Sequence, residues 1–345
     1  MKLSNLFSKP DLSEQKRQLR ERLRNHNSTA FPDGIFGQIE IEQQGVRLKV
    51  ALPFDPQSVL SELEQIASEL ELKVDYEYKP VVGLQRDIKV KTIVAIASGK
   101  GGVGKSTVTA NLAATLANQG HRVGVIDADI YGPSMPLMFG LQGQSVATKD
   151  EKTMEPMLAH NVYLNSIGFL IPEDKAAIWR GPMASRALMQ ILNETNWPEL
   201  DVLLVDMPPG TGDIQLTLSE NIKCDGAVVV TTPQNVALAD AEKGVAMFKK
   251  VNTPILGVVE NMSQFVCDSC GKVHDLFGTD GAARISGAEN VPLLGQLPLV
   301  RDVRVAADSG KPYVLQQNQQ NEYAPLAFSL MMQLSKQTQQ IIALS

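Results

Sequence analysis

The chain has 345 residues, of which 43% are hydrophobic and 20% charged, and a net charge of -6, a composition typical of a globular protein. It contains neither an apolar run of the roughly 20 residues that span a bilayer nor the apolar stretch of a signal peptide, so we expect a cytoplasmic protein without stable membrane association. The negative charge argues against nucleic acid as a partner, because binding a phosphate backbone requires clustered basic residues.

The first 30 residues form a basic segment with seven Lys/Arg and three Asp/Glu. Asp11 and Glu14 have the spacing of a capping box, which predicts a helix that carries Leu12, Leu19 and Leu23 on one side. A charged helix of this kind usually packs on the body of its own protein, and binding to a membrane or a partner is the alternative.

Residues 31–79 are predicted to form a small α+β domain. Alternating apolar residues at 38–42 and 46–52 predict two strands, and a helical period at 59–70 followed by an alternating run at 74–78 predicts a helix and a third strand. Residues 80–91 are polar and contain Pro80 and Gly83, which predicts a linker.

The remainder, residues 92–345, is predicted to be an α/β domain with a mostly parallel sheet. Short apolar runs alternate there with helical stretches, and continuous apolar runs are typical of parallel strands covered by helices on both faces. The predicted strands are residues 93–97, 123–126, 202–205, 227–230, 255–259 and 293–297.

A glycine-rich segment at 98–107 lies between the first of these strands and a predicted helix at 108–118. It matches the P-loop pattern G-x-x-x-x-G-K-[ST], whose backbone N–H groups and helix N-terminus bind phosphate. Lys105 is expected to reach the β and γ phosphates, and the Ser106 hydroxyl to bind Mg²⁺. The residues expected to bind ATP here are Gly99, Lys100, Gly101, Gly102, Val103, Gly104, Lys105, Ser106 and Thr107.

Acidic residues follow two of the predicted strands. Asp127 and Asp129 come after the second strand, and Asp206 ends the run 202–205 in the Walker B pattern, which places a carboxylate beside magnesium. The rigid prolines and flexible glycines of residues 207–213 predict a switch loop sensitive to the γ phosphate. The switch residues are Gly210, Gly212 and Asp213, with a helix N-cap as the alternative role for Asp213.

Asn261 follows the predicted strand 255–259. Its amide can both donate to and accept from adenine, which favours ATP over GTP. A buried structural asparagine is the alternative.

Three cysteines are too few for a disulfide framework, but Cys267 and Cys270 lie three residues apart. In a reducing compartment such a pair is typical of metal or redox sites. A zinc site with His274, a thioredoxin-like redox pair and a purely structural turn are alternative interpretations. Cys224, before an apolar strand, is expected to lie in the core.

The segment Lys-Gly-Gly-Val-Gly-Lys at 100–105 resembles the deviant Walker A group of ATPases. This resemblance implies a nucleotide-sandwich homodimer in which Lys100 reaches the partner's phosphates. It also implies that Asp129 positions the attacking water, so that Lys100, Lys105 and Asp129 are the expected catalytic residues. Asp127 would join Ser106 and Asp206 around Mg²⁺, and capping of the next turn is the alternative for both Asp127 and Asp129.

Three motifs narrow the resemblance further: Asp-Ile-Tyr-Gly-Pro-Ser at 129–134, Pro-Pro-Gly-Thr-Gly-Asp at 208–213, and Asn-Met-Ser at 261–263 followed by the cysteine pair. Together they closely resemble the Mrp/ApbC family of iron–sulfur cluster carriers over residues 92 to about 310. Residues 37–79 resemble a reduced MIP18-like domain, without the cysteine that this domain often carries.

The resemblance implies an ATPase that carries a [4Fe–4S] cluster and transfers it to apo-proteins, with slow ATP hydrolysis as the switch. A [4Fe–4S] cluster takes four thiolates, which Cys267 and Cys270 from two chains would supply. The implied partners are a second copy of the chain, apo iron–sulfur proteins and a cluster scaffold or donor. A spatial-positioning ATPase of the same fold and a zinc-stabilised nucleotide sensor are the alternatives.

Overall fold

The computed structural model describes residues 12–25, 38–42, 45–53, 60–70, 72–78, 81–148, 152–170, 181–316 and 321–337. The chain divides into two compact units, a smaller one assigned to Met1–Pro80 and Thr338–Ser345 and a larger one that spans Val81–Gln337. Among the described helices, none combines the length and apolar character needed to cross a bilayer.

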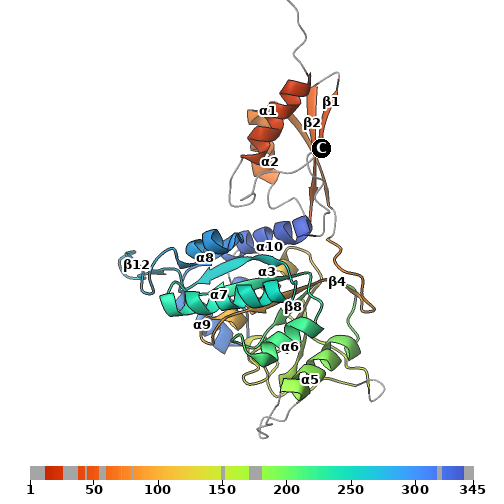
Figure 1. The fold of residues 1–345 in the computed structure, drawn as a ribbon, viewed down its shortest axis with the longest axis vertical. Helices are drawn as coiled ribbons and strands as arrows, with labels where there is room; N and C mark the ends of the chain where they lie inside the picture. The colour runs from red at the N-terminus through yellow and green to blue at the C-terminus, as the bar shows by residue number, and fades with distance from the viewer. Residues whose placement is uncertain are drawn as a thin grey trace, which may run out of the picture. The chain divides into compact units, whose positions relative to one another are not determined.

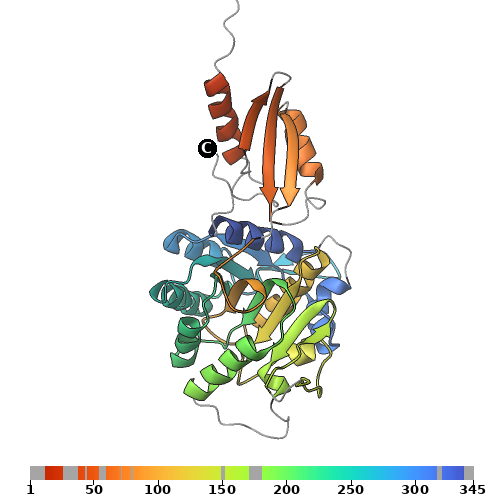
Figure 2. The ribbon, with the colours of Figure 1, turned by 90° about the vertical axis from the view of Figure 1, so that its right-hand side faces the viewer.

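The smaller unit is a three-stranded sheet with two helices (Figure 2). β1 and β2 are antiparallel, whereas β2 and β3 are parallel and joined through α2. Leu48, Val50 and Leu52 alternate along β2 and are buried, as are Leu63 and Ile66 of α2. The predicted order of strand, strand, helix, strand is therefore confirmed. The elements are α1 (Leu12–Arg24), β1 (Gln38–Glu42), β2 (Gly45–Leu52), α2 (Leu60–Glu69) and β3 (Leu72–Tyr78).

The helix predicted near the N-terminus is also present. α1 contains the three leucines of the predicted helix, and Leu23 is fully buried. Asp11, the first residue of the predicted capping box, lies outside the described residues.

The larger unit contains an eight-stranded sheet in the order β13-β10-β9-β4-β8-β5-β7-β6. All neighbouring strands are parallel except β6 and β7, which are antiparallel at one edge. The mostly parallel sheet predicted from the sequence is confirmed. Its strands are β4 (Val90–Ala97), β5 (Val123–Asp127), β6 (Met157–Ala159), β7 (Val162–Ser166), β8 (Leu200–Asp206), β9 (Gly226–Thr231), β10 (Ile255–Asn261) and β13 (Leu293–Leu297).

Helices lie on both sides of this sheet (Figure 1), where α3 packs against α10, α5 against α6, and α7 against α8. Ile93, Leu203, Val229 and Phe248 belong to the core between the sheet and its helices. The described helices are α3 (Lys105–Asn118), α4 (Met135–Met138), α5 (Gly181–Glu194), α6 (Asp213–Asn221), α7 (Asn235–Lys250), α8 (Gly281–Glu289), α9 (Arg301–Asp308) and α10 (Tyr323–Gln337), with short 3₁₀ turns at Ile167–Phe169 and Tyr313–Leu315.

The segment expected as a linker, residues 80–91, is held against the larger unit from residue 81 onward. Its anchor is the buried carboxylate of Asp225, which accepts from the Leu84 N–H at 2.6 Å and from the Ile93 N–H at 2.7 Å. Arg86 neutralises this carboxylate at 2.8 Å. Asp225 thus joins β4, the strand before the P-loop, to the residues that precede this strand.

Candidate functional site

The site begins where the central strands end. β5 and β8 pair in a register that places Asp127 directly opposite Asp206, both at the last position of their strands. Both carboxylates are fully buried. The two neighbouring apolar strands therefore bring together two acidic groups that lie 79 positions apart in the sequence, as their residue numbers show.

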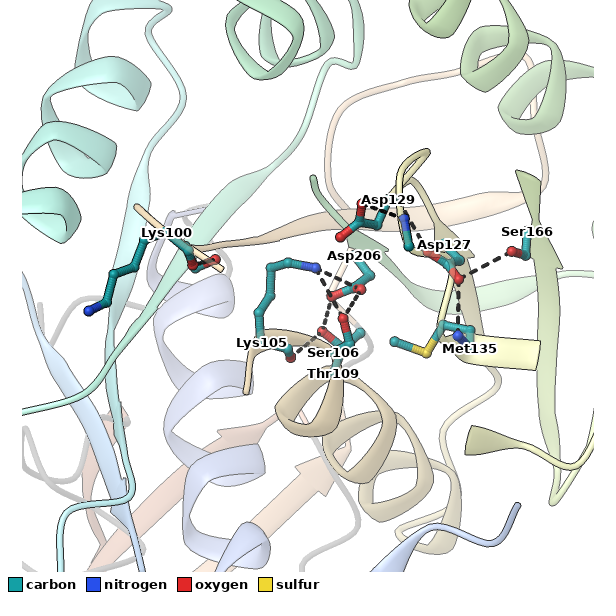
Figure 3. A network of polar contacts seen from close by, with 11 residues as sticks. Lys100, Lys105, Ser106, Thr109, Asp127, Asp129, Met135, Ser166 and Asp206 are labelled. Atoms are coloured by element: carbon teal, nitrogen blue, oxygen red, sulfur yellow. Dashed lines mark hydrogen bonds and ion pairs between the residues drawn. The ribbon is translucent and has the colours of Figure 1, made fainter. Parts of the chain in front are cut away.

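The P-loop faces these carboxylates from the N-terminus of α3. Gly104 adopts a left-handed conformation with φ of 82°, and α3 begins at Lys105. The Lys105 ammonium lies 2.8 Å from Asp206 Oδ2, and the Ser106 hydroxyl donates to the same oxygen at 2.6 Å. Thr109, one turn further along, donates to Asp206 Oδ1 at 2.7 Å. Figure 3 shows this network, in which one carboxylate takes three polar partners from a single helix.

Asp127 is held by a different set of donors. Its carboxylate accepts from the Met135 N–H at 3.0 Å, the Ser166 hydroxyl at 3.2 Å and the Asp129 N–H at 3.2 Å (Figure 3). Burial, together with the negative charge of Asp206, raises the pKa of Asp127 to about 7. The hydrogen bond from the Asp129 N–H is what the alternative role of Asp127, capping of the next turn, would produce. The position of Asp127 opposite Asp206 fits its expected role as a magnesium ligand.

Asp129 is more open than Asp127, and its carboxylate accepts from the Gly132 N–H at 3.3 Å. Burial raises its pKa above the ordinary value, an effect that the nearby Lys105 ammonium partly offsets. A carboxylate with a raised pKa beside a phosphate-binding loop suits proton transfer or the positioning of water.

Lys100 is separate from this network. Figure 3 shows its side chain directed away from Lys105, and its carbonyl accepts from the Ser98 hydroxyl at 2.9 Å. The P-loop backbone also packs closely against α7 at Gly99, because a Cβ at this position would overlap the carbonyl of Asp240. Val103 is buried beneath the loop.

The expected switch segment continues from β8 to α6. Gly210 has φ of 100° and donates its N–H to the Ser98 carbonyl at 3.0 Å, which ties the segment to the start of the P-loop. Gly212 occupies the cap position of α6, and Asp213 is the first helical residue. Asp213 is therefore not the cap, and its exposed side chain lies in the first turn of the helix.

Asn261 lies at the end of β10 and contacts the P-loop directly. Its side-chain amide donates to the Val103 carbonyl at 2.9 Å. This contact agrees with the structural alternative, and it leaves the side-chain oxygen for adenine in the interpretation that favours ATP.

The cysteine pair forms the turn of a short hairpin between β11 (Phe265–Val266) and β12 (Val273–His274). The Cys267 N–H donates to the Lys272 carbonyl at 2.9 Å, and the Gly271 N–H to the Cys267 carbonyl at 2.8 Å. Hydrogen bonds from the N–H groups of Ser269 and Cys270 to the Cys267 sulfur lower the pKa of that thiol. Donors directed at a sulfur favour the thiolate, which is the form that binds metal.

The described residues contain no group of three or more His, Cys, Asp and Glu side chains placed to hold a metal ion. His274, the further ligand in the alternative zinc interpretation, lies beside Phe265 with ring centroids 6.3 Å apart and the two rings tilted by 36°. A hairpin turn also differs from the helix start that a thioredoxin-like pair occupies. Cys224 is buried as expected, and burial raises its pKa to about 12.

Two members of the polar network, Thr109 and Ser166, were not predicted from the sequence. The Thr109 position follows Lys105 by four residues, and this helical spacing would have indicated a shared face. Ser166 ends β7, a strand that no continuous apolar run indicated.

A strand, P-loop and helix facing a Walker B carboxylate at the carboxyl edge of a mostly parallel sheet define a P-loop NTPase. The family model described as "ParA: NUBPL iron-transfer P-loop NTPase" matches residues 89–334, and the chain belongs to this family. The family resemblance inferred from the sequence motifs is therefore confirmed.

The chain is also similar to individual members of this class of protein. The "Iron-sulfur cluster carrier protein" of Escherichia coli K12 is 48% identical over 283 residues, which cover 78% of this chain and 77% of that protein. A nucleotide-binding protein from Archaeoglobus fulgidus, solved in complex with ADP, is 38% identical with a TM-score of 0.60 and covers 68% of this chain and 91% of its own. The cell division ATPase MinD of Pyrococcus furiosus is 25% identical with a TM-score of 0.53, over 71% and 98% of the two chains.

Proposed function

We propose that the protein is an ATP-dependent carrier that binds a [4Fe–4S] cluster between two copies of the chain and transfers it to apo iron–sulfur proteins. The observation that carries this proposal is the thiol pair of Cys267 and Cys270 on a hairpin that directly follows the P-loop contact of Asn261. The relatives named as cluster carriers support it. The carrier would work in the cytoplasm and receive its cluster from a scaffold or donor protein.

The nucleotide part of the proposal depends on the donor set at the carboxyl edge. Mg²⁺ prefers oxygen ligands, and the Ser106 hydroxyl and the carboxylates of Asp206 and Asp127 are oxygen donors gathered at one point. Lys105 would bind the phosphates next to them. Bound Mg²⁺ would neutralise phosphate charge, while the backbone N–H groups of residues 99–107 would orient the phosphates.

Hydrolysis would require a positioned water and further positive charge. Asp129 lies beside this site with a raised pKa, which suits the positioning of water. Lys100 projects away from its own Lys105, as a residue would that serves the nucleotide of a second copy. We infer slow turnover, with Gly210 and the segment through Asp213 reporting the state of the nucleotide.

The cargo part of the proposal depends on sulfur chemistry. Four thiolates hold a [4Fe–4S] cluster, and each chain presents Cys267 and Cys270 at one accessible turn. A two-fold dimer supplies the set of four. A cluster shared between two chains can leave when the interface opens, which suits a carrier.

The test is anaerobic reconstitution with iron and sulfide, followed by iron and zinc counting and visible absorption. We expect about two iron atoms per chain and the absorption of a [4Fe–4S] centre in the wild type, and loss of both in Cys267→Ala. Cys224→Ala is the matched control, because Cys224 is buried away from the hairpin; this variant should keep the cluster. Uptake of zinc alone would favour the nucleotide sensor, and an unaltered cluster in Cys267→Ala would contradict the carrier.

A further inference from the structure

The P-loop and the cysteine hairpin are joined by a short stretch of chain. Asn261 binds the carbonyl of Val103 at 2.9 Å, and Cys267 follows six positions later. Met262 also reaches the P-loop, since its terminal methyl would lie 3.6 Å from a Cβ placed on Gly104. Asn261 thus binds the phosphate-binding loop, and the Met262 side chain lies next to it, immediately before the chain enters the hairpin.

The backbone at Met262 is held in an unusual conformation. Its φ is 57°, in the left-handed region that non-glycine residues rarely adopt. Such a conformation persists only where the surrounding contacts fix it. At Met262 these contacts come from its two neighbours in the chain: Asn261 binds the P-loop, and Ser263 binds the end of β13.

The residues between Met262 and the hairpin are attached to the end of β13. The Ser263 N–H and hydroxyl both donate to the Leu297 carbonyl, at 2.9 Å and 3.1 Å. The Gln264 carbonyl accepts from the Leu299 N–H at 2.7 Å. This stretch therefore has little freedom to absorb a displacement.

The chain that follows the hairpin returns to β10 at the start of α8. Glu260, which is 1% exposed, accepts from the Ala282 N–H at the start of α8 and from the Gln296 amide, both at 2.7 Å. The two ends of the segment 260–282, which contains the hairpin, are thus joined by a hydrogen bond to the buried Glu260 carboxylate. A shift at the end of β10 would move the hairpin as a unit.

We propose that Met262 is a positioning residue that couples the P-loop to the cysteine pair within one chain. A change in the Val103–Gly104 backbone on nucleotide binding would pass through Asn261 and Met262 to the turn at Cys267. This inference rests on the proposed function. It explains how nucleotide binding could affect the cluster-binding cysteines through contacts within a single chain. Because coupling of two sites is reciprocal, a ligand on the thiols would alter nucleotide affinity by the same factor.

The test measures the thiols of the full-length protein without any cluster. The rate of alkylation of Cys267 and Cys270 by iodoacetamide is followed by mass spectrometry, with and without Mg²⁺ and a non-hydrolysable ATP analogue. We expect the nucleotide to change the wild-type rate about fivefold or more, in the range of ordinary allosteric coupling. Cys224 is buried and serves as the internal unmodified reference.

Met262→Gly accepts the left-handed backbone, but it removes the side chain that lies next to Gly104 and lets the link flex. We expect it to bind the analogue and to lose most of the nucleotide effect on alkylation, while Met262→Leu retains it. Asn252→Gly is the matched control, because Asn252 also has φ of 57° but lies between α7 and β10, at the opposite end of β10 from Asn261; it should behave as the wild type.

The inference is overturned if the wild-type rate does not respond to nucleotide, or if Met262→Gly keeps the full response. The second result would place the coupling in contacts between two copies of the chain. Failure of the proposed function would be seen separately, as absence of a cluster after reconstitution, because the alkylation assay requires no iron.

Discussion

Asp127→Asn should change how the stability of the protein depends on pH. Burial and the facing charge of Asp206 raise the pKa of Asp127 from 3.8 to about 7. The folded chain thus favours the protonated acid, so its stabilising effect is complete below about pH 4 and is lost as the pH rises through about 7. A shift of this size corresponds to about 4 kcal/mol in the free energy of unfolding, a large part of the 5–15 kcal/mol typical of a domain.

The assay is urea denaturation between pH 4 and 8 in the presence of EDTA, followed by tryptophan fluorescence, to which the buried Trp197 contributes. We expect Asp127→Asn to approach the wild type at pH 4 and to exceed its stability at pH 8 by up to about 4 kcal/mol. A difference between the two proteins that stays constant across this range would refute the reasoning.

Asp201→Asn provides a control of opposite sign. Burial acts to raise the pKa of Asp201, but the Lys91 ammonium at 2.7 Å and the Arg122 N–H at 2.8 Å lower it below its ordinary value. The ionised carboxylate therefore stabilises the fold at neutral pH, and this contribution is lost as the pH falls through the lowered pKa. The substitution should destabilise the protein across the whole range from pH 4 to pH 8, with no gain at pH 8, and its effect should shrink only as the pH falls below about 4.

Five further substitutions test three separate parts of the structure. Lys100→Ala should abolish phosphate release while calorimetry still detects nucleotide binding; unchanged turnover would contradict its action on a second copy. Gly99→Ala places a methyl against a main-chain carbonyl of α7 and should lower the free energy of unfolding by about 1–3 kcal/mol. Gly101→Ala, whose Cβ finds its nearest neighbour at 4.0 Å, should have little effect on unfolding. Arg86→Ala leaves a buried carboxylate without its cation and should cost about 3–5 kcal/mol. Arg122→Ala removes an exposed pair with Glu199 and a longer contact of 3.6 Å with Asp201, which keeps Lys91, so this variant should cost about 1 kcal/mol. Equal losses in the two arginine variants would refute the assignment of burial.

The six strands predicted in the larger unit were visible in the sequence because each is a short, largely apolar run. β7 was not, because it contains two buried polar residues, Asn165 and Ser166. Part of what holds their side chains is tertiary, such as the 2.8 Å hydrogen bond from the Asn165 amide to the Thr195 hydroxyl. A local pattern cannot show partners that lie 30 positions away.

The candidate site was predictable to the extent that its residues form short motifs. The P-loop, the aspartates after two strands and the cysteine spacing each occur within a few positions. The register that sets Asp127 against Asp206, and the contact of Asn261 with the P-loop, depend on strand order in the sheet. No single segment encodes that order, which sets the charge of Asp206 opposite Asp127 and brings Asn261 to the P-loop.

The polar network explains why so many charged groups are tolerated at the buried edge of a sheet. Lys105 and Asp206 have side chains that are 5% and 0% exposed, a placement that costs several kcal/mol per ion unless both charges are paired. Ser106 and Thr109 complete the hydrogen bonds of the same carboxylate. Under the proposed function, Mg²⁺–ATP would bind by exchange of partners: Lys105 would pair with the phosphates in place of Asp206, and Asp206 and Ser106 would hold the metal. Each group stays paired before and after the exchange, so the site can bind a highly charged ligand without ever leaving a buried charge alone.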